Sequence, residues 1–428
     1  MTALSKPQQH SFDDALAALL TAAPAAQAAE TAPLNEALNR VLAQDVVSTI
    51  DVPPADNSQM DGYAVRSSDC KLAGAVLKIT QRIPAGKPSH EPLLAGQAAR
   101  IFTGGFMPQG ADAVVMQESC SANGDTLSVN ESVCAQQWVR PQGSDVARGS
   151  TVLAAGTRLH AAQLGLIASL GLAMVAVSPR LTVGLLCTGD ELIEPGAVAP
   201  GALPFGSIFN SNRPMITALL QGLGCTVVDA GTVPDTLPAT QKALAELATR
   251  CDVIVSTGGV SVGEEDHVKP AVQALGELHL WSIAMKPGKP LAFGKVAVGD
   301  KKSPFENTPS ENTLFKHTPF IGLPGNPVSG FVTFVMLVRP YVLRAMGAVD
   351  VTPPRMAVPA AFEWTKADKR REFLRVQLNA DGHAVLFPNQ NSGVLTSAAW
   401  AHGIADIPAG SVVRVGDMIQ YLPMAGLL

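Results

Sequence analysis

The chain has 428 residues, of which 47% are hydrophobic, 16% charged and 5% aromatic, and its formal net charge is −5. This length normally divides into several domains, and the composition is typical of a folded protein rather than a disordered one. The acidic balance excludes a general attraction for nucleic acid or for an anionic membrane, so an anionic ligand must be captured by locally placed cations.

The cysteines and the N-terminus favour a cytoplasmic protein. Six cysteines are scattered without a C-x-x-C pair, which argues against a zinc site or a disulfide framework. The N-terminus lacks the basic-then-apolar run of a secretion signal. The long apolar stretch over residues 161–177 is broken by Gly165 and Gly171, so it predicts a buried helix and a strand rather than a membrane span. We therefore expect no membrane partner and no nucleic-acid partner.

Within the first 140 residues the spacing of apolar residues changes once, from a helical pattern to a strand-like one. Apolar spacing predicts helices over residues 12–20 and 34–42, with Ser11 as the cap of the first. At IDVPPADNS the pattern changes, and short apolar runs separated by Gly, Pro, Asn and Asp then predict a small β domain. The chain returns to a helix at HAAQLGLIASLG, so we expect the segments on either side of the β domain to pack together.

From Leu181, buried strands alternate with helices at the spacing of a parallel sheet with crossover helices. The polar stretch between Gly299 and Thr318 is predicted to be an exposed loop, and Pro327 begins the last helix of this region. Short alternating segments after residue 350 predict a second small β domain or barrel. The predicted fold class is multidomain α/β plus β, with a mixed linker domain (1–50 and 141–179), an inserted β domain (51–140), a parallel-sheet α/β domain (180–349) and a C-terminal β-barrel (350–428).

Ligands of open parallel sheets bind beyond the carboxyl ends of the strands, and two of the loops expected there carry acids or glycines. TGDEL places Asp190 and Glu191 after Thr188, where they could hold Mg²⁺; a helix-capping Asp beside a solvated Glu is the alternative. STGGVSVGEEDH follows the strand DVIV, and its glycines let backbone amides cradle a phosphate or a pterin, unless the loop is merely structural. The candidate binding and metal residues of this second loop are Gly258, Gly259, Ser261, Gly263 and Asp266.

Two further loops are expected at the same edge. KPGKP holds Lys286 and Lys289 on a stiff turn that ends at Pro290, which suits a tetrahedral oxyanion; a solvated basic turn is the alternative. GLPGNPVSG is a strand end followed by a helix start, where free amides and a hydroxyl can bind an anion. Its candidate residues are Pro324, Asn326 and Ser329. Four such loops on one sheet edge favour a binding site over four loops that are each merely structural or solvated.

Three polar residues stand outside the α/β domain. Asp61 and Asp145 each lie in a Gly-adjacent turn, and their type and position alone favour turn formation. Thr103, in FTGG, cannot be assigned a role from spacing.

Eight motifs together carry a resemblance. DNSQMDGYAVR, TGGFMPQGADAVVMQE, GSDVARG, LCTGDEL, NSN, STGGVSVGEED, MKPGKPLAFG and GLPGNPVSGFVTF resemble, in order and across nearly the whole chain, the MoeA family of molybdopterin molybdenumtransferases; the gephyrin C-terminal region is similar. The resemblance implies an elongated four-domain homodimer whose α/β domain binds molybdopterin. It also implies an enzyme that inserts molybdate into adenylylated molybdopterin and releases AMP in the presence of Mg²⁺.

The resemblance also implies roles for single residues. Positions that match Asp61, Thr103, Asp145, Glu191 and Asp266 matter for activity in relatives, and the first half of one subunit can reach the α/β crevice of the other. Positions that match Lys286, Lys289, Pro290 and Ser329 lie at the oxyanion and pterin pocket in relatives.

Two positions depart from the family pattern, and three rival functions stay open. Asn210 stands where relatives more often have Asp, and Cys187 replaces a usual Ser. The preceding enzyme, molybdopterin adenylyltransferase, shares the TGGVS-type loop and is the first rival; it and other assembly proteins are also candidate partners. The second rival is a scaffold like gephyrin, and the third is a chain specialised for tungstate.

Overall fold

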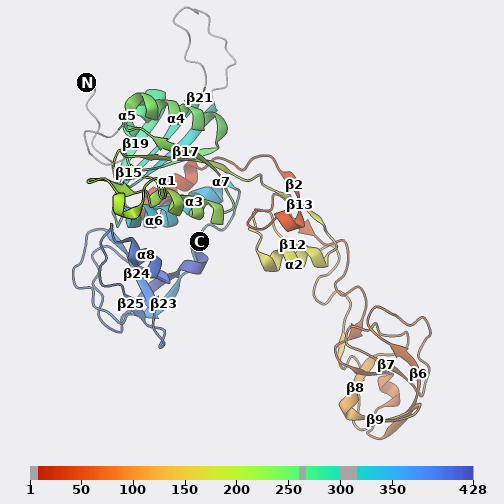
Figure 1. The fold of residues 1–428 in the computed structure, drawn as a ribbon. Helices are drawn as coiled ribbons and strands as arrows, with labels where there is room; N and C mark the ends of the chain where they lie inside the picture. Colours follow the sequence, from red (N-terminus) through yellow and green to blue (C-terminus); the bar gives the residue numbers. More distant parts are fainter. Residues whose placement is uncertain (1–7, 260–266, 299–315, 428) are drawn as a thin grey trace, which may run out of the picture.

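The computed structural model describes residues 8–259, 267–298 and 316–427 (Figure 1). Three large sheets organise this part of the chain, one of seven strands and two of six. Figure 1 shows them as separate layers along an extended molecule, with one six-stranded sheet at the far end from the other two. The far sheet has a core of its own, whereas one core of the seven-stranded sheet also takes Phe373, Ile404 and Leu422 of the C-terminal sheet, so a ligand site can lie between these two sheets.

The seven-stranded sheet has the order β1-β19-β21-β22-β18-β14-β17. Strands β17, β14, β18 and β22 are parallel, as predicted, whereas β21 runs antiparallel to both of its neighbours. The predicted all-parallel sheet is therefore wrong at β21, which has no crossover helix before it or after it among the described residues and pairs as in a hairpin. The strands are Gln8–His10 (β1), Thr182–Thr188 (β14), Thr226–Val233 (β17), Val253–Thr257 (β18), Gly276–Ile283 (β19), Pro290–Val298 (β21) and Lys316–Leu323 (β22).

Helices cover both faces of this sheet, and alternation along the strands explains why (Figure 1). In β18, Val253 and Val255 face one core together with Phe12, whereas Ile254 faces the other together with Leu244. The first core takes α1 (Phe12–Ala22), α3 (Asn212–Gly222), α6 (Pro327–Thr333), a π-helical segment (Phe334–Val338) and α7 (Arg339–Ala345). The second takes α4 (Leu237–Arg250) and α5 (Val268–Leu275).

The N-terminal segment joins this sheet. The predicted first helix is confirmed as α1, and the Ser11 Oγ accepts a hydrogen bond from the Asp14 amide at 3.1 Å. The sequence pattern groups residues 1–50 with residues 141–179; within that first segment, however, β1 pairs with the edge strand β19, and Phe12 is buried in the α/β core. An unpaired sheet edge and a long-range apolar contact outweigh proximity along the chain.

The segment over residues 34–42 is not the predicted helix. Only a 3-10 turn forms, at Leu34–Glu36, and the backbone of Asn39 then adopts a φ of 63°, which a continuing helix cannot contain. Small paired strands surround it, and α2 and β13 confirm the predicted helix and strand in the apolar stretch. The elements are β2 (Glu30–Pro33) with β13 (Met174–Val177), β3 (Val46–Val47) with β12 (Thr151–Leu153), and α2 (Ala161–Ser169).

The six-stranded sheet at the far end is built by residues of the predicted β domain. Its order is β8-β5-β7-β6-β10-β9. Two chain crossings connect it to the rest, and they pair through β4 with β11 and through a bridge between Val52 and Val146. The strands of the crossings are Asn57–Ser58 (β4) and Val139–Arg140 (β11). The strands of the six-stranded sheet are Gly62–Val65 (β5), Ala75–Ile83 (β6), Gln97–Ile101 (β7), Ala113–Met116 (β8), Cys120–Asn123 (β9) and Thr126–Val129 (β10).

The third sheet contains strands of the C-terminal region and one strand from the α/β region. Its order is β20-β24-β26-β27-β23, with β25 paired to β24. A bridge links Ala360 to Ala384, but closure as a barrel and the domain boundaries stay predictions. The elements are Met285–Lys286 (β20), Met356–Pro359 (β23), Arg371–Leu378 (β24), Ala384–Leu386 (β25), Leu395–Trp400 (α8), Gly403–Ile407 (β26) and Met418–Pro423 (β27).

One helical run among the described residues, Pro327–Ala345, is long and apolar enough to cross a membrane. However, 94% of that window is buried inside the molecule. Arg339, within it, donates hydrogen bonds to the carbonyls of Val351 and Gly426. The run is therefore a core helix of the α/β region.

Arg371 predicts a stability difference between two of its contacts. Its guanidinium bonds the buried carboxylate of Asp406 twice at 2.6 Å and the exposed carboxylate of Asp13 at 2.9 Å. Arg371→Ala should lower the free energy of unfolding by about 2 kcal/mol, because the buried Asp406 loses its two shortest hydrogen bonds and keeps, among the described residues, only the ion pair with Arg355 at 3.1 Å. Asp13→Asn should lower it by less than about 1 kcal/mol. Urea unfolding followed by circular dichroism tests both, and equal losses would contradict the prediction.

Candidate active site

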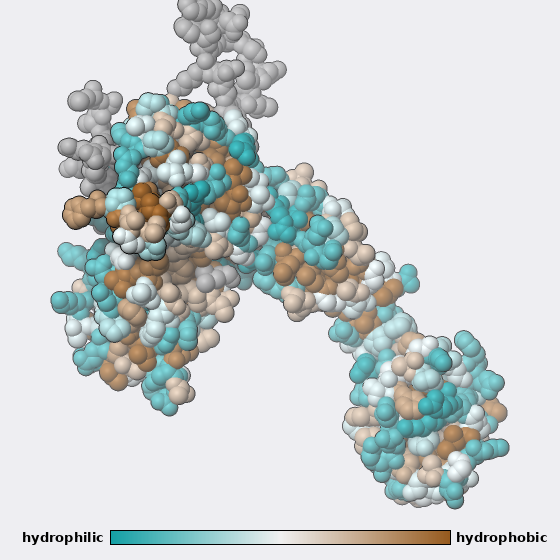
Figure 2. All heavy atoms as spheres, in the orientation of Figure 1, coloured by the Kyte–Doolittle hydropathy of each residue, from teal (hydrophilic) through white to brown (hydrophobic). Residues whose placement is uncertain are grey.

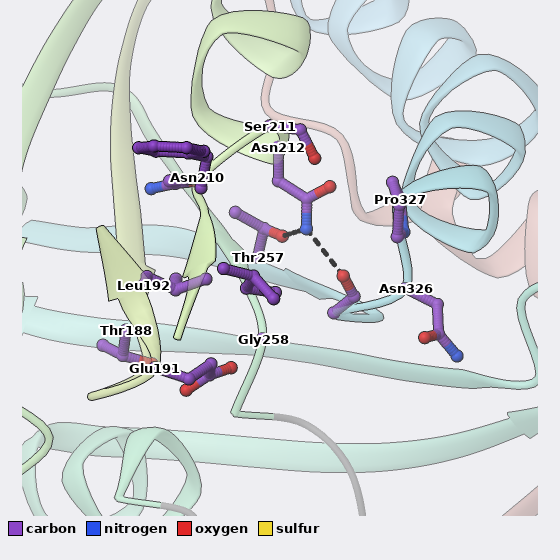
Figure 3. A pocket seen from close by; sticks show the side chains of 13 residues that line it. Thr188, Glu191, Leu192, Asn210, Ser211, Asn212, Thr257, Gly258, Asn326 and Pro327 are labelled. Carbon is purple, nitrogen blue, oxygen red and sulfur yellow. Dashed lines mark hydrogen bonds between the residues drawn. The ribbon is translucent and has the colours of Figure 1, made fainter. Parts of the chain in front are cut away.

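The carboxyl ends of β14, β18 and β22 border a cavity of about 400 Å³, called here the sheet-edge cavity (Figure 3). The loops that leave these strands, and the segment that enters α3, form its wall. Parallel strands bring their ends to one edge, which is why loops far apart in the sequence meet here. The cavity is lined by Thr188, Glu191, Leu192, Ile208, Phe209, Asn210, Ser211, Asn212, Thr257, Gly258, Gly325, Asn326 and Pro327.

Asn212 ties two of these loops together. Its Nδ2 donates to the Thr257 Oγ1 at 2.8 Å and to the Gly325 carbonyl at 2.7 Å (Figure 3). Its Oδ1 is buried without a hydrogen-bond partner among the described residues. Since a buried polar atom without a partner is costly, this oxygen is suited to a donor group on a ligand.

The glycine loop begins as predicted. Gly258 has φ +86° and lines the cavity, and a Cβ there would stand 3.2 Å from the Thr188 carbonyl oxygen. Gly259 also has a left-handed φ, of +67°. The close approach of the two loops therefore requires a glycine at position 258. Ser261, Gly263 and Asp266 lie outside the described residues.

The two acids of TGDEL separate. Glu191 lines the sheet-edge cavity, whereas Asp190 does not. The Asp190 Oδ1 accepts a hydrogen bond from the Asp235 amide at 3.2 Å. Asn210 is 2% exposed; its Nδ2 donates to Glu194, and its Oδ1 accepts from the Arg213 amide. Asn210 therefore lines the cavity with its side-chain amide already engaged in hydrogen bonds to neighbouring residues.

A second cavity, of about 360 Å³, adjoins the first through Asn326 and is called here the lysine-turn cavity. One wall is the KPGKP turn, and the opposite wall comes from the C-terminal sheet and the loop after β25. It is lined by Lys286, Pro287, Gly288, Lys289, Pro290, Asn326, Ser329, Arg370, Gln390, Asn391 and Ser392. The predicted candidates Lys286, Lys289, Pro290 and Ser329 are therefore together, whereas Pro324 lines neither cavity.

Close packing fixes the KPGKP turn. Gly288 has φ +106°, and a Cβ there would lie 2.2 Å from the Thr333 Oγ1, so no other residue fits. The Ile283 amide donates to the Lys289 carbonyl at 2.8 Å. Strand β20 then pairs with β24 in register, with Lys286 opposite Glu372. The turn is thus held by both the α/β core and the C-terminal sheet.

The two lysines of the turn differ in their surroundings. The Lys286 Nζ lies 2.8 Å from the Glu372 Oε1 and 3.6 Å from the Asp368 Oδ2. Lys289 is exposed, and no ion pair of its side chain is found within the described part of the chain. Arg370 lines the same cavity and makes a two-bond pair with Asp368, which holds the pKa of that carboxyl well below its usual range.

The start of α6 is less open than predicted. The Val328 amide donates to the Ser392 carbonyl at 3.0 Å, and the Gly330 amide donates to the Asn326 carbonyl at 2.9 Å. These two amides are therefore not free for an anion. Ser329 is 5% exposed at the base of the cavity.

Asp61 and Thr103 lie on the distant six-stranded sheet, next to β5 and β7 (Figure 1). The Asp61 Oδ1 accepts hydrogen bonds from the Thr103 amide and hydroxyl, both at 2.8 Å. These bonds lower the pKa of Asp61. Asp145 lies within the paired crossings, next to Val146, and its amide donates to the Val52 carbonyl at 3.0 Å. None of the three lines either cavity of the same chain.

Sequence reasoning missed several residues of these cavities. Asn212 and Thr257 lie within the quoted motifs NSN and STGGVSVGEED, but the clamp they form joins positions 45 residues apart. Arg370 and Glu372 lie in RREFLR, yet only the pairing of β20 with β24 brings them to the lysine turn. No spacing rule could have identified either contact.

A glycine-lined cavity at parallel strand ends, joined to a cationic turn, is typical of an α/β protein whose site suits an anionic small molecule. Comparison with known families identifies which one. Three family models match: the MoeA N-terminal region (domain I and II) at residues 10–171, the probable molybdopterin binding domain at residues 184–344, and the MoeA C-terminal region (domain IV) at residues 357–424. The chain belongs to the MoeA family.

Relatives and solved structures agree over most of the chain. A molybdopterin molybdenumtransferase of Haemophilus influenzae is 39% identical over 366 residues, 85% of either chain. Molybdopterin molybdenumtransferase 2 of Mycobacterium tuberculosis is 34% identical over 402 residues, 91% of this chain and 94% of that one. The crystal structure of the molybdopterin biosynthesis moeA protein from Pyrococcus horikoshii OT3 has a TM-score of 0.79 at 27% identity, and the match covers 98% of this chain and 100% of that one.

The Asp61–Thr103 contact yields a titration prediction. Thr103→Ala removes the hydroxyl donor, so the pKa of Asp61 should rise toward its ordinary value while the amide bond keeps part of the shift. Carboxyl ¹³C chemical shifts against pH measure this pKa. Thr126→Ala, on β10 of the same sheet, is the control and should leave it unchanged. A pKa of Asp61 that is identical in Thr103→Ala and in the unmodified protein would contradict the assignment.

Proposed function

We propose that this chain is a molybdopterin molybdenumtransferase, which inserts molybdate into adenylylated molybdopterin and releases AMP. The observation that carries the proposal is the junction of two cavities of different chemistry at Asn326. One has glycine backbone and amide groups suited to a pterin and its phosphates, and the other has fixed cations suited to a tetrahedral oxyanion. Family membership and the names of the relatives support the same activity.

The chain's own residues then act by positioning. Gly258 lets the pterin phosphate approach the backbone, and Asn212 offers its unpaired Oδ1 to a donor group of the pterin. Lys286, Lys289 and Arg370 hold the oxyanion beside the dithiolene. Water attacks the phosphoanhydride bond, so that AMP and the pterin monophosphate separate, and the two dithiolene sulfurs replace oxygen ligands of the oxyanion, which leave as water with the thiol protons. The chain holds the oxyanion and the pterin together, so proximity supplies much of the rate.

Magnesium belongs to the proposal. No group of three or more His, Cys, Asp or Glu side chains that could hold a metal is found in residues 8–259, 267–298 and 316–427. Mg²⁺ in phosphate sites normally takes one or two carboxylates and completes its shell with phosphate and water, so a site with Glu191 in the cavity fits it. Glu191 would hold the ion, which would supply charge neutralisation on the pyrophosphate, while Asp190, outside the cavity lining, and Asp266, outside the described residues, stay predicted ligands.

We also propose a homodimer in which Asp61, Thr103 and Asp145 of one subunit complete the sheet-edge cavity of the other. Support comes from their position: Asp61 is exposed and held in a fixed orientation by Thr103, yet it lies on a sheet that lines neither cavity of its own chain. We place the enzyme in the cytoplasm, where its six free cysteines are stable, with molybdopterin adenylyltransferase as the partner that supplies its substrate.

The activity is tested by anaerobic incubation with adenylylated molybdopterin, Mg²⁺ and either molybdate or tungstate. We expect equal amounts of AMP and metal-bound pterin, with loss of both when Mg²⁺ is removed. Consumption of ATP and unadenylylated molybdopterin would instead identify an adenylyltransferase.

The two lysines of the turn should behave differently. Lys289→Ala should raise the KM for molybdate roughly tenfold with an unchanged melting temperature, because it removes a cation that is exposed and has no described ion pair. Lys286→Ala should also raise the KM, but it should cost about 3 kcal/mol of stability because Glu372 is left buried without its closest cation. AMP release against molybdate concentration and thermal unfolding measure the two effects. Identical melting temperatures for both variants would contradict the distinction.

A further inference from the structure

Two of the three cations that line the lysine-turn cavity already have counter-ions. Lys286 contacts Glu372 at 2.8 Å and Asp368 at 3.6 Å, and Arg370 donates to Asp368 through Nε at 2.9 Å and Nη2 at 2.7 Å. Three cations and two carboxylates leave one positive charge for an oxyanion that carries two negative ones. The cavity is therefore less cationic than its lining suggests.

Glu372 is the more constrained of the two carboxylates. It is 1% exposed, its Oε1 accepts from Lys286, and its Oε2 accepts from the Trp364 Nε1 at 2.6 Å. The Lys286 Nζ also lies 5.8 Å from the centre of the Trp364 ring. Both carboxylate oxygens of Glu372 are hydrogen-bonded, and Glu372 does not line the cavity. It can therefore influence a ligand only through Lys286 and through its own charge.

A cavity that passes an oxyanion on to another molecule must bind the oxyanion and then release it. Cations that bind the oxyanion equally before and during transfer lower its KM without speeding the transfer, and strong ground-state binding opposes release. A buried carboxylate next to a binding lysine reduces this hold and keeps the ammonium in one place. Glu372 lies on β24, directly opposite Lys286 in the strand register. The backbone pairing therefore keeps the carboxylate beside the ammonium group.

We propose that Glu372 is a positioning residue that fixes Lys286 and weakens the lysine-turn cavity's hold on a tetrahedral oxyanion, so that the oxyanion can be handed on. The identity of that oxyanion as molybdate rests on the proposed function. The electrostatic part does not, because it concerns the binding of the oxyanion alone.

The test is equilibrium binding of molybdate alone to the full chain, by calorimetry. Glu372→Gln keeps the shape and removes the charge, so the Kd should fall roughly tenfold, the influence of one charge at this range in a partly solvated site. Turnover should respond in the opposite sense, with kcat and KM for molybdate both lower. Glu372→Asp, which restores the charge, should return the Kd toward that of the unmodified protein. Unchanged or weaker binding in Glu372→Gln would overturn the proposal.

Two more variants separate this role from a structural one. Asp406→Asn removes another buried carboxylate of the same sheet, which pairs with Arg371 and lines neither cavity. It should lower the melting temperature and leave the molybdate Kd unchanged. If Glu372→Gln does not fold, Asp368→Asn, whose side chain is 21% exposed, should also tighten molybdate binding, and its failure to do so would overturn the proposal.

The binding and turnover results are independent. Tighter molybdate binding by Glu372→Gln in a protein that releases no AMP would support the counter-ion role and refute the proposed function. Normal turnover with no effect of Glu372→Gln on the Kd would do the reverse. A protein that binds no molybdate in any form would refute the counter-ion role.

Discussion

The pairing of β20 with β24 is the contact on which the lysine-turn cavity depends. It joins the KPGKP turn, which leaves the α/β region, to a strand 86 residues further along the chain. Without it the turn would keep the wall formed by Gly288 and Ser329 but would lose the wall formed by Arg370 and the loop after β25. The hydrogen bond from the Val328 amide to the Ser392 carbonyl closes the same junction from the other side. The anion site is therefore a property of two packed sheets and belongs to neither alone.

The sheet-edge cavity depends on a different constraint, the common direction of β14, β18 and β22. Parallel strands bring three loops to one edge, and Asn212 then fixes two of them with one amide group. Hydrophobic burial holds this edge in place, because β14, β18 and β22 each have residues in the cores on both faces of the sheet. The polar groups of the cavity can thus stay partly unpaired without loosening the fold. On the face of the molecule drawn in Figure 2, hydrophilic and hydrophobic residues are interspersed.

Much of this could be predicted from the sequence, and the failures share a cause. Strand and helix alternation after Leu181, and the loops at the strand ends, follow from local periodicity and from glycine and proline positions. The direction of β21, the attachment of β1 to β19 and the counter-ion of Lys286 all depend on pairing between distant segments. The residue pattern within one segment does not show which distant segment will pair with it. The helix predicted over residues 34–42 failed for a local reason, because Asn39 adopts a left-handed backbone that apolar spacing does not encode.

The two paired crossings that carry the six-stranded sheet have a mechanical consequence. Because β4 with β11, and the bridge from Val52 to Val146, form a two-stranded neck, the sheet beyond it can turn only as a unit. Asp61 and Thr103 both lie beyond the neck, so a change in its angle moves them together and preserves the hydrogen bonds between them. A twist at residues 52 and 146 would therefore displace the carboxylate of Asp61 without changing its orientation relative to Thr103.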